Sequence, residues 1–501
     1  MPTDTGVPEP IPAAADGVID RGLLSPVTVG VDALVSDAAI ADALILAEIG
    51  LVRAWASVGV APRADAEAVS AALGWRAPNP VGGTPTLPSL ALASTEREAL
   101  LRAMLSGSAA GGNPVIALVA PLRELAPAGC RAWIHRGATS QDILDSALML
   151  VSRRAAAEVA QRLRGVLTRL DRFAEEHRSV AAAARTLTQH AVPTTVGLRT
   201  AGWAAGIRRA LAGLDAAVAA LPAQLGGAGG TLAAPAEIGG ADAARALPAA
   251  LARELGLAAP DAPWHTTRWP VTELGDALTR VLDALGVFAA DTATLSRTEI
   301  GELAEGDGGG SSAMPQKRNP VGSILIRSAA LRAPQLGATL HLAAALAVDE
   351  RPDGAWHAEW PTLRELLRLT LGASAHAERL ASGLRLRPEA VARNLSVTGG
   401  LLVAERVALA VTPLIGAERF RDVIAAAGSG ADLATLLRAQ PELAGLDLEA
   451  LVDPHHYLGL APELTDALLT PSPASSPADR ANPAGQGRAH DRPSPAEQEQ
   501  P

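Results

Sequence analysis

The sequence predicts an all-α protein, built as a central bundle of long helices with smaller helical domains before and after it. Alanine and leucine, both strong helix formers, dominate a chain in which 48% of residues are hydrophobic and only 2% aromatic. Several helical runs exceed 25 residues, a length typical of helical bundles. No segment alternates polar and apolar residues over a sustained stretch, so we expect little sheet.

The helices can be assigned in order along the chain. The first begins at Ser36, a good N-cap residue, and continues to about residue 59. The longest run, 140–177, starts with Ser140 and Asp142, is interrupted only by Gly165, and would be about 50 Å long at roughly 1.5 Å per residue. The other long helices are expected at about 194–221, 270–303 and 320–347. After about residue 366 the helices become shorter.

The chain of 501 residues is too long for one core of the usual size. The last residues, 471–501, include no large apolar residue and cannot bury a core, so we expect this tail to be disordered. We expect five parts: a flexible arm (1–20), an N-terminal helical domain (21–115), a central long-helix bundle (116–365), a C-terminal helical domain (366–470) and a disordered tail (471–501).

Composition and motifs narrow the function classes. A net charge of −10 argues against a sequence-independent nucleic-acid binder. A single cysteine, Cys130, fits a reducing compartment, the N-terminus lacks a signal peptide, and the apolar runs are too short to span a bilayer. We therefore expect a cytoplasmic protein with no membrane partner.

The glycine-rich stretch 226–230 lacks the context of a dinucleotide or phosphate motif and is interpreted as a loop. The scattered histidines predict no metal site, and we expect no cofactor.

One stretch differs in kind from the rest. "GDGGGSSAMPQKRNP", 306–320, lies between two expected long helices and contains Lys317, the only lysine; the other 42 of the 43 basic residues are arginine. Glycines bring backbone N–H groups close to an anion, and lysine offers a compact point charge that arginine does not reproduce. The stretch therefore indicates a site that holds a carboxylate or an enediolate.

Three motifs in order resemble the fumarase/aspartase superfamily. "GSSAMPQKRNP", 310–320, matches the signature loop GSSxMPxKxNP at every fixed position. "HRGATSQDILD", 135–145, resembles the first conserved region, and "RTLTQHAVPTTVGLRTAGW", 185–203, resembles the second. The resemblance implies the superfamily's all-α fold, assembled as a homotetramer in which each active site takes one region from each of three subunits.

The resemblance also implies roles for particular residues. Members of the superfamily remove a proton alpha to a carboxylate and expel a group from the beta carbon. Ser311 stands at the position of the base, and Ser312, Lys317 and Asn319 would hold the carboxylate on which negative charge develops. His135 is a candidate carboxylate partner. The remaining expected substrate ligands are Thr139, Ser140, Thr188 and Gln189; Ser140 could also cap its helix.

Within the superfamily, the 3-carboxymuconate cycloisomerase branch has similar local sequences at 225–233, 263–268 and 349–363. By itself, "WHAEW" in the last of these predicts only a helix start with an ion pair. This resemblance implies a small anionic tricarboxylate substrate, 3-carboxymuconate, interconverted with its lactone in protocatechuate degradation by the β-ketoadipate pathway.

Two departures from the superfamily pattern bear on the reaction. Leu187 occupies the position of a histidine that acts as general acid in many members, and Ile324 that of its glutamate partner. Both positions are apolar together, as burial without charge requires. A lactone carboxylate is a weakly basic leaving group and needs no acid, which favours the cycloisomerase. The alternative is a fumarate-releasing lyase of the adenylosuccinate or argininosuccinate lyase type, in which His190 could supply the acid.

Overall fold

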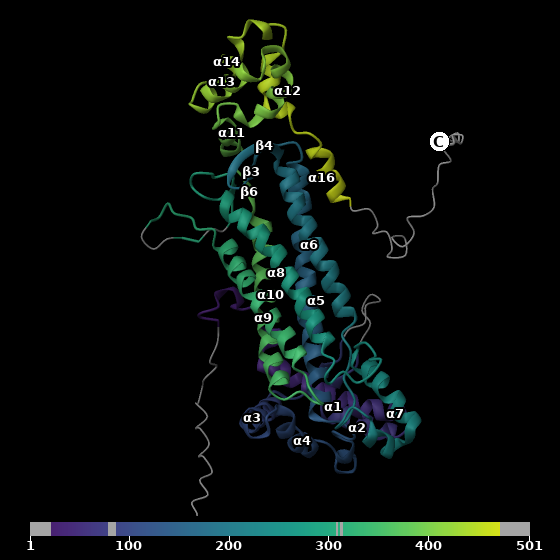
Figure 1. Ribbon diagram of the computed structural model, residues 1–501. Helices are drawn as coiled ribbons and strands as arrows, with labels where there is room; N and C mark the ends of the chain where they lie inside the picture. The colour runs from purple at the N-terminus through teal and green to yellow at the C-terminus, as the bar shows by residue number, and fades with distance from the viewer. Residues whose placement is uncertain (1–21, 79–86, 307–308, 311–313, 471–501) are drawn as a thin grey trace, which may run out of the picture.

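The protein is an elongated bundle of long helices with smaller helical groups at its two ends (Figure 1). This architecture, seen in a computed structural model, covers residues 22–78, 87–306, 309–310 and 314–470. The expected all-α class is confirmed. The flexible arm and the disordered tail expected at the two termini lie outside the described residues.

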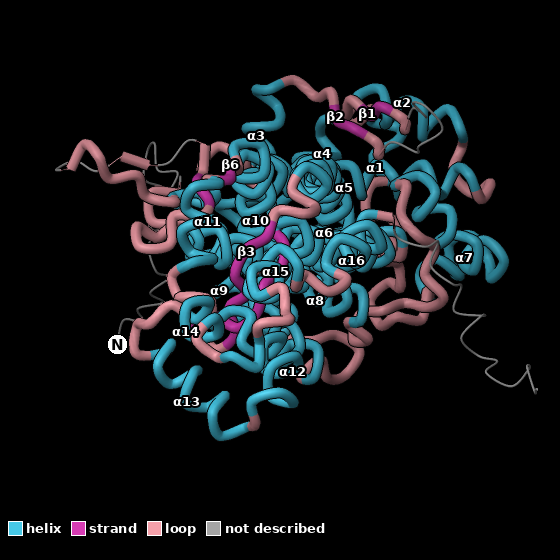
Figure 2. The backbone as a smooth tube through the Cα atoms, turned by 90° about the horizontal axis from the view of Figure 1, so that it is seen from above, coloured by secondary structure: helices cyan, strands magenta, loops and turns pink. Residues whose placement is uncertain are grey.

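Five helices form the bundle and run between its two ends. The longest has 37 residues and corresponds to the long run expected from Ser140. Viewed along the bundle axis, the helices are seen nearly end-on beneath a β-hairpin (Figure 2). The five are α5 (Ser140–Glu176), α6 (Val196–Ala219), α8 (Trp269–Leu295), α9 (Val321–Ala345) and α10 (Gly354–Gly383).

The lower end in Figure 1 carries the N-terminal helices and α7. As expected, Ser36 caps the first helix, and its hydroxyl oxygen accepts from the Ala39 N–H at 3.2 Å. Two 3-10 turns, Pro26–Thr28 and Ala33–Val35, precede it. The helices at this end are α1 (Asp37–Ser57), α2 (Arg63–Ala72), α3 (Ser94–Gly111), α4 (Pro114–Leu125) and α7 (Ala233–Leu255), with a 3-10 helix at Ala128–Trp133.

The upper end carries the C-terminal helices. A separate apolar core there contains Val403, Val407, Val411 and Leu433, whereas one large core runs through the bundle and the N-terminal helices. Three short 3-10 helices connect this group, at Leu401–Val403, Pro441–Leu443 and Pro454–His456. The helices are α11 (Pro388–Ser396), α12 (Ala404–Ile415), α13 (Ala417–Gly428), α14 (Leu433–Arg438), α15 (Leu448–Val452) and α16 (Ala461–Leu469).

Two of the expected domain boundaries fall inside helices. The boundary at 115–116 lies within α4, and that at 365–366 lies within α10, which continues to Gly383. The last helix, α16, returns to pack on α6 and α5, where Asp466 pairs with Arg178 at the end of α5. The C-terminal segment is therefore tied to the bundle at both of its ends.

Sheet is sparse, as expected, and consists of three antiparallel two-stranded pairs in the described residues. Two are minimal: β1 (Trp75–Arg76) with β2 (Ser89–Leu90), and β5 (Leu303–Ala304) with β6 (Arg385–Leu386). The third, β3 (Ala181–Thr186) with β4 (Gln189–Thr195), is a hairpin with a register shift between Ala183 and Arg185. It carries the second motif and links the end of α5 to the start of α6.

Within the described residues, no single helix has both the length and the apolar character needed to cross a membrane. One bent pair, Pro388–Ser396 with Leu401–Ile415, meets that test on length and composition alone.

The close approach of α10 to the N-terminal 3-10 turn gives a stability prediction. A Cβ on Gly372 would collide with the Val27 carbonyl oxygen, whereas a Cβ on Gly202 in α6 would meet nothing within 4 Å. We expect Gly372→Ala to lower the free energy of unfolding by about 1–3 kcal/mol, as overpacking does. Gly202→Ala should be neutral or stabilising by up to about 1 kcal/mol, because alanine favours helix. Urea unfolding of both variants measures this; equal stabilities would contradict the proposed contact.

Candidate functional site

The start of α5, where the first motif lies, is organised around the buried carboxylate of Asp142. Its Oδ2 accepts from the N–H of Thr139, the N-cap residue, at 2.9 Å. The carboxylate also accepts from two loop residues: the Gly226 N–H donates to Oδ1 at 2.8 Å, and the Gly227 N–H donates to Oδ2 at 3.0 Å. An acidic side chain at the third helical position suits both the free N–H groups and the helix dipole. The N-cap is thus Thr139, and Ser140 is the first helical residue rather than the cap.

The glycine-rich stretch 226–230 is a loop, as expected, but it is held against the start of α5. Besides the two glycine N–H groups, the fully buried Asp142 carboxylate contacts His265 Nε2 at 2.8 Å. Arg351 closes the arrangement, because its guanidinium donates to Thr139 Oγ1 at 2.7 Å and to the Ala228 carbonyl at 3.0 Å. Three segments far apart in the sequence therefore meet at the first motif.

A buried ion network lies beneath this site. The Arg268 side chain, only 1% exposed, pairs with Asp145 of α5 and Glu359 of α10, each at 2.7 Å. Trp356 Nε1 donates to Asp145 at 2.9 Å. Burial raises the pKa of Glu359 even though Arg268 opposes the shift. The ion pair expected for "WHAEW" is confirmed, and it fixes α8 and α10 to the start of α5.

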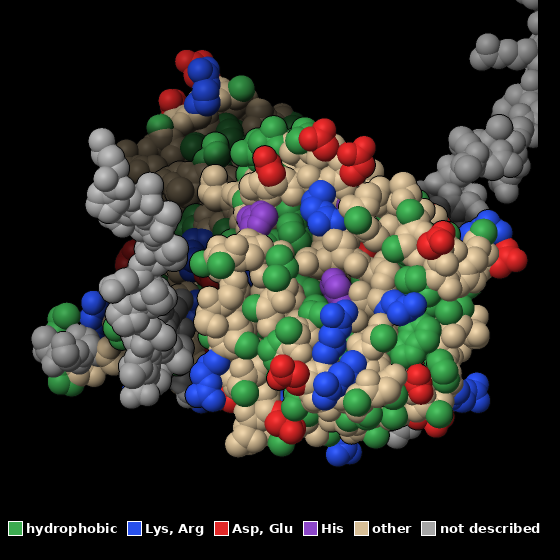
Figure 3. Space-filling model, turned by 90° about the horizontal axis from the view of Figure 1, so that it is seen from below, with side chains coloured by type: hydrophobic (Ala, Val, Ile, Leu, Met, Phe, Trp, Pro, Cys, Tyr) green, Lys and Arg blue, Asp and Glu red, His purple; other side chains and the backbone are tan. Residues whose placement is uncertain are grey.

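His135 precedes the helix and is half-buried. Its ring Nδ1 lies 2.7 Å from Glu48 Oε1, and its backbone N–H donates to Glu48 Oε2 at 2.9 Å. Burial lowers the pKa of His135, but the hydrogen bond and negative charge of Glu48 outweigh it, and the net pKa is raised. His135, Thr139 and Ser140 are thus brought together at one end of the bundle. Figure 3 views the molecule from this end, where histidine and arginine or lysine side chains are exposed.

The second motif lies on the β3–β4 hairpin at the other end. Its two turn residues, Leu187 and Thr188, have φ of +50° and +71°, values that favour glycine or asparagine. Leu187 is 95% exposed, and Thr188 and Gln189 are exposed beside it. The expectation that Leu187 and Ile324 are buried is wrong for the single chain, because the hairpin tip projects from it and Ile324 is 48% exposed.

The base of the hairpin is strongly charged. Glu302, 1% exposed, accepts from Arg185 at 2.5 Å and lies 3.4 Å from Arg199. Burial raises the pKa of Glu302, but the two arginines and Asn394 hold it below its usual value. Burial and the Arg185 charge lower the pKa of His190. These contacts anchor the strands while the tip remains free.

The signature loop leaves the bundle between α8 and α9. Gly309 and Asn319 join its two sides by backbone hydrogen bonds of 2.9 and 2.8 Å, and Lys317 is exposed. Glu305 caps α9 by accepting from Gly322 N at 3.0 Å and Ser323 N at 2.8 Å. Ser311 and Ser312, the expected base and its neighbour, lie outside the described residues.

The three motifs do not meet within one chain. The first lies at the start of α5 and the second follows its end, so a helix of 37 residues, about 55 Å long, separates them. Gly306, which precedes the signature loop, lies beside Gly383 at the far end of α10. Figure 1 shows the hairpin and the first motif at opposite ends of the bundle.

Backbone strain gathers at these motifs. Five non-glycine residues of the described chain have positive φ: Leu187 and Thr188 at the hairpin tip, and His135, Leu232 and Asp349 around the start of α5. Such conformations are rare and concentrate at functional sites. Leu232 follows the glycine-rich loop, and Asp349 precedes Arg351. The sequence analysis gave no site role to Glu48, Asp142, Arg268 or Arg351; the similarity at 263–268 and 349–363 was the signal for the last two.

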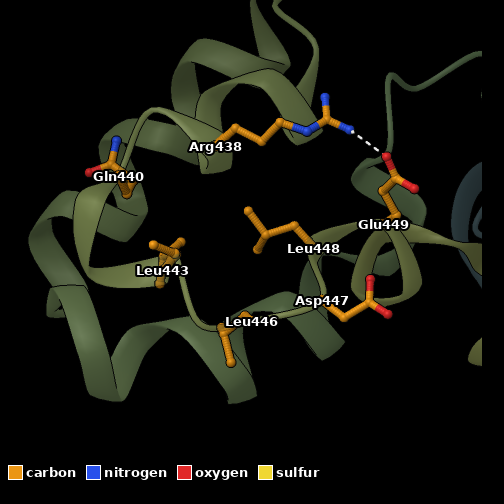
Figure 4. A pocket seen from close by; sticks show the side chains of 8 residues that line it. Arg438, Gln440, Leu443, Leu446, Asp447, Leu448 and Glu449 are labelled. Carbon is orange, nitrogen blue, oxygen red and sulfur yellow. Dashed lines mark hydrogen bonds and ion pairs between the residues drawn. The ribbon is translucent and has the colours of Figure 1, made fainter.

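A shallow cavity of about 350 Å³ in the C-terminal helices contains none of the predicted site residues. Figure 4 shows its lining, with Arg438 paired to Glu449 at 3.5 Å. Among the described residues, no three histidine, cysteine, aspartate or glutamate side chains are arranged to hold a metal ion.

The known proteins that this chain resembles include lyases and cycloisomerases. A family described as Lyase matches residues 94–334. Nitrosuccinate lyase of Streptomyces davaonensis is 44% identical over 469 residues, which cover 90% of this chain and 94% of that protein. The 3-carboxy-cis,cis-muconate cycloisomerase of Pseudomonas aeruginosa is 40% identical over 72% of this chain and 80% of its own. The solved cycloisomerase of Acinetobacter calcoaceticus aligns with a TM-score of 0.76 and 30% identity, over 88% and 97% of the two chains.

The contacts of Asp142 give a second prediction. Asp142→Asn should place an amide N–H group against donors and lower the free energy of unfolding by on the order of 3 kcal/mol. The control is Asp242→Asn, since Asp242 is exposed and pairs with Arg245 three residues on; its effect should stay within about 0.5 kcal/mol. Thermal unfolding measures both, and an unchanged Asp142→Asn protein would show that the carboxylate does not organise the helix start.

Proposed function

The chain belongs to the fumarase/aspartase superfamily, and from this premise we propose that it eliminates a weakly basic anion from the carbon beta to a carboxylate. Nitrosuccinate is the first candidate substrate, and a carboxymuconolactone is the second. The observation that carries the proposal is Leu187, which stands where many members have their histidine acid. Without an acid at that position, the departing group has to leave as a stable anion.

Nitrosuccinate fits this requirement. A base, for which Ser311 is the candidate, removes the proton next to one carboxylate, and the electron pair of the C–H bond moves into an aci-carboxylate. That pair then forms the C=C bond of fumarate while the adjacent C–N bond breaks and its electrons leave with nitrite. Nitrite, like a carboxylate, is a weak base and departs without protonation. Ser312, Lys317 and Asn319 would stabilise the charge that develops on the carboxylate.

The relatives favour nitrosuccinate over the lactone that the sequence motifs put first. Similarity to the nitrosuccinate lyase is higher, at 44% against 40% identity, and extends over more of both proteins. Its product would also be fumarate, as in the lyase alternative. An adenylosuccinate or argininosuccinate substrate has less support, because its nitrogen leaving group needs an acid, and His190 has a pKa lowered by burial and Arg185.

The cycloisomerase is kept as the second candidate because of specific residues. The segments 263–268 and 349–363, which resemble that branch, supply His265, Arg268, Arg351 and Glu359 to the start of α5. In lactone opening, the ring C–O bond breaks and its electrons leave with a carboxylate, which again needs no acid. Both candidates share the proton abstraction and differ only in the bond that breaks.

We also propose a homotetramer whose active sites combine regions of three subunits. The first motif and the hairpin are about 55 Å apart in one chain. This distance supports the proposal, because two motifs so far apart cannot both contact the same small molecule. Large apolar side chains on the outer faces of α8 and α9 support it as well: Val287, Leu331 and Leu342 are 58%, 78% and 62% exposed. A cytoplasmic location is proposed on the single cysteine alone.

A direct comparison of substrates tests the proposed function. The purified protein should release nitrite and fumarate in equal amounts from nitrosuccinate, faster than it changes the ultraviolet absorbance of 3-carboxymuconate. The reverse ranking would select the cycloisomerase, and no turnover of either would reject the proposal. Ser311→Ala should abolish turnover of the preferred substrate; more than a few per cent residual activity in a folded variant would remove Ser311 as the base.

Mixing of inactive subunits tests the shared site. His135→Ala and Ser311→Ala should each be inactive as pure proteins, since each removes one region from every site. After joint unfolding and reassembly, some sites should combine an intact first region with an intact signature loop, and activity should return. Mixed tetramers that remain inactive, although both parents fold and assemble, would contradict a site built from several subunits.

A further inference from the structure

Glu48 is a buried carboxylate that contacts His135. It lies in α1, and its side chain is 0% exposed. One carboxylate oxygen accepts from the His135 backbone N–H at 2.9 Å, and the other lies 2.7 Å from His135 Nδ1. Among the described residues, no arginine or lysine pairs with Glu48. Because a buried carboxylate needs compensation, His135 is the group that provides it.

This contact defines the His135 ring. With Nδ1–H donating to Glu48, the ring presents Nε2 on its other side, and the side chain is 20% exposed. The charged groups that act on the ring are Glu48 and Asp142, which favour the imidazolium, and Arg123, which opposes it. The net effect of these groups is to raise the pKa of His135, so Nε2 carries a proton at a higher pH than in a free histidine.

The backbone around His135 is fixed as well. Its φ of +60° is rare for a residue with a side chain. The neighbouring carbonyl groups are held by Arg123, which donates to Ile134 O at 3.0 Å, and by Trp55 Nε1, which donates to Arg136 O at 2.8 Å. A ring held in this way is preorganised for a ligand, since little rotamer freedom remains to be lost on binding.

We propose that Glu48 is a positioning residue, which holds His135 so that its Nε2–H donates to a second, non-reacting anionic group of the substrate beside Thr139. The inference rests on the proposed function in assuming a substrate with two anionic groups at this site. It adds that binding of this substrate weakens as pH rises and His135 loses its proton.

A purely structural role for the pair makes a different prediction. Since the pKa of folded His135 is raised, the pair stabilises the fold below the pKa of the unfolded residue, and this contribution is lost as pH rises through the folded value. Loss of Glu48 would then change unfolding at low pH and leave ligand binding unaffected. Binding and stability therefore have to be measured on the same variants.

The test uses calorimetric titration of the full-length protein with succinate, a dicarboxylate that lacks a leaving group. Measurements from pH 5.5 to 8.5, in two buffers with different ionisation heats, give both affinity and proton uptake. Wild type should bind more weakly as pH rises, with uptake of up to about one proton. Glu48→Gln keeps the shape of the side chain and lacks its charge. Its midpoint should shift to lower pH, and it should bind more weakly than wild type above that midpoint.

Two further variants complete the test. Glu254→Gln is the matched control, because Glu254 pairs with Arg53 of α1 at 2.6 Å and does not contact His135; it should follow wild type. His135→Gln should bind succinate without this pH dependence, and it stands in for Glu48→Gln if that variant does not fold.

The inference is overturned by a folded Glu48→Gln protein that binds like wild type, or by a His135→Gln protein that keeps the pH dependence. It is equally overturned by wild type that binds succinate without proton uptake or fails to bind it at pH 6. Succinate binding requires no turnover, so these results stand apart from the substrate assays. Turnover without proton-linked binding would reject only the inference, and linked binding without turnover only the proposed function.

Discussion

The hydrogen bonds of one carboxylate, Asp142, organise the region on which the first motif depends. It accepts from the Thr139 N–H at the start of the longest helix and from two backbone N–H groups of the glycine-rich loop, and it contacts His265. Each partner belongs to a different part of the chain, so a single buried charge sets the relative positions of α5, the loop before α7 and the segment before α8. Arg351 and Thr139 then complete the surface above it. A buried charge is tolerated there because every oxygen is satisfied.

Regular helical features could be predicted from the sequence, whereas features that depend on distant partners could not. Alanine- and leucine-rich runs predicted the long helices, and Ser36 predicted a helix start, because both signals are local. The β3–β4 hairpin was not predicted, since Leu187 and Thr188 adopt positive φ without the glycine or asparagine that usually marks such a turn. Nothing local in the sequence marks Glu48, because its partner is 87 positions away. The signature loop was recognisable, but its two serines lie outside the described residues.

The chemistry follows from a missing group as much as from the groups present. In the proposed function, Leu187 and Ile324 stand where the acid and its partner would be, and the proposed substrates are those whose departing part is already a stable anion. Nitrite and carboxylate both satisfy that condition, and both reactions begin with loss of a proton next to a carboxylate. The two proposed activities therefore share their first step and differ in the bond that breaks. Relatives of both kinds align over most of the chain.

The length of α5 has an evolutionary consequence. Because the first motif and the hairpin sit at opposite ends of one 37-residue helix, removing a single residue from its middle would draw the two ends together by about 1.5 Å and rotate one against the other by roughly 100°. All the helices that pack beside it would have to change in step. Insertions and deletions among related proteins should therefore occur mainly in the terminal helical groups, while the bundle helices change by substitution and keep their lengths.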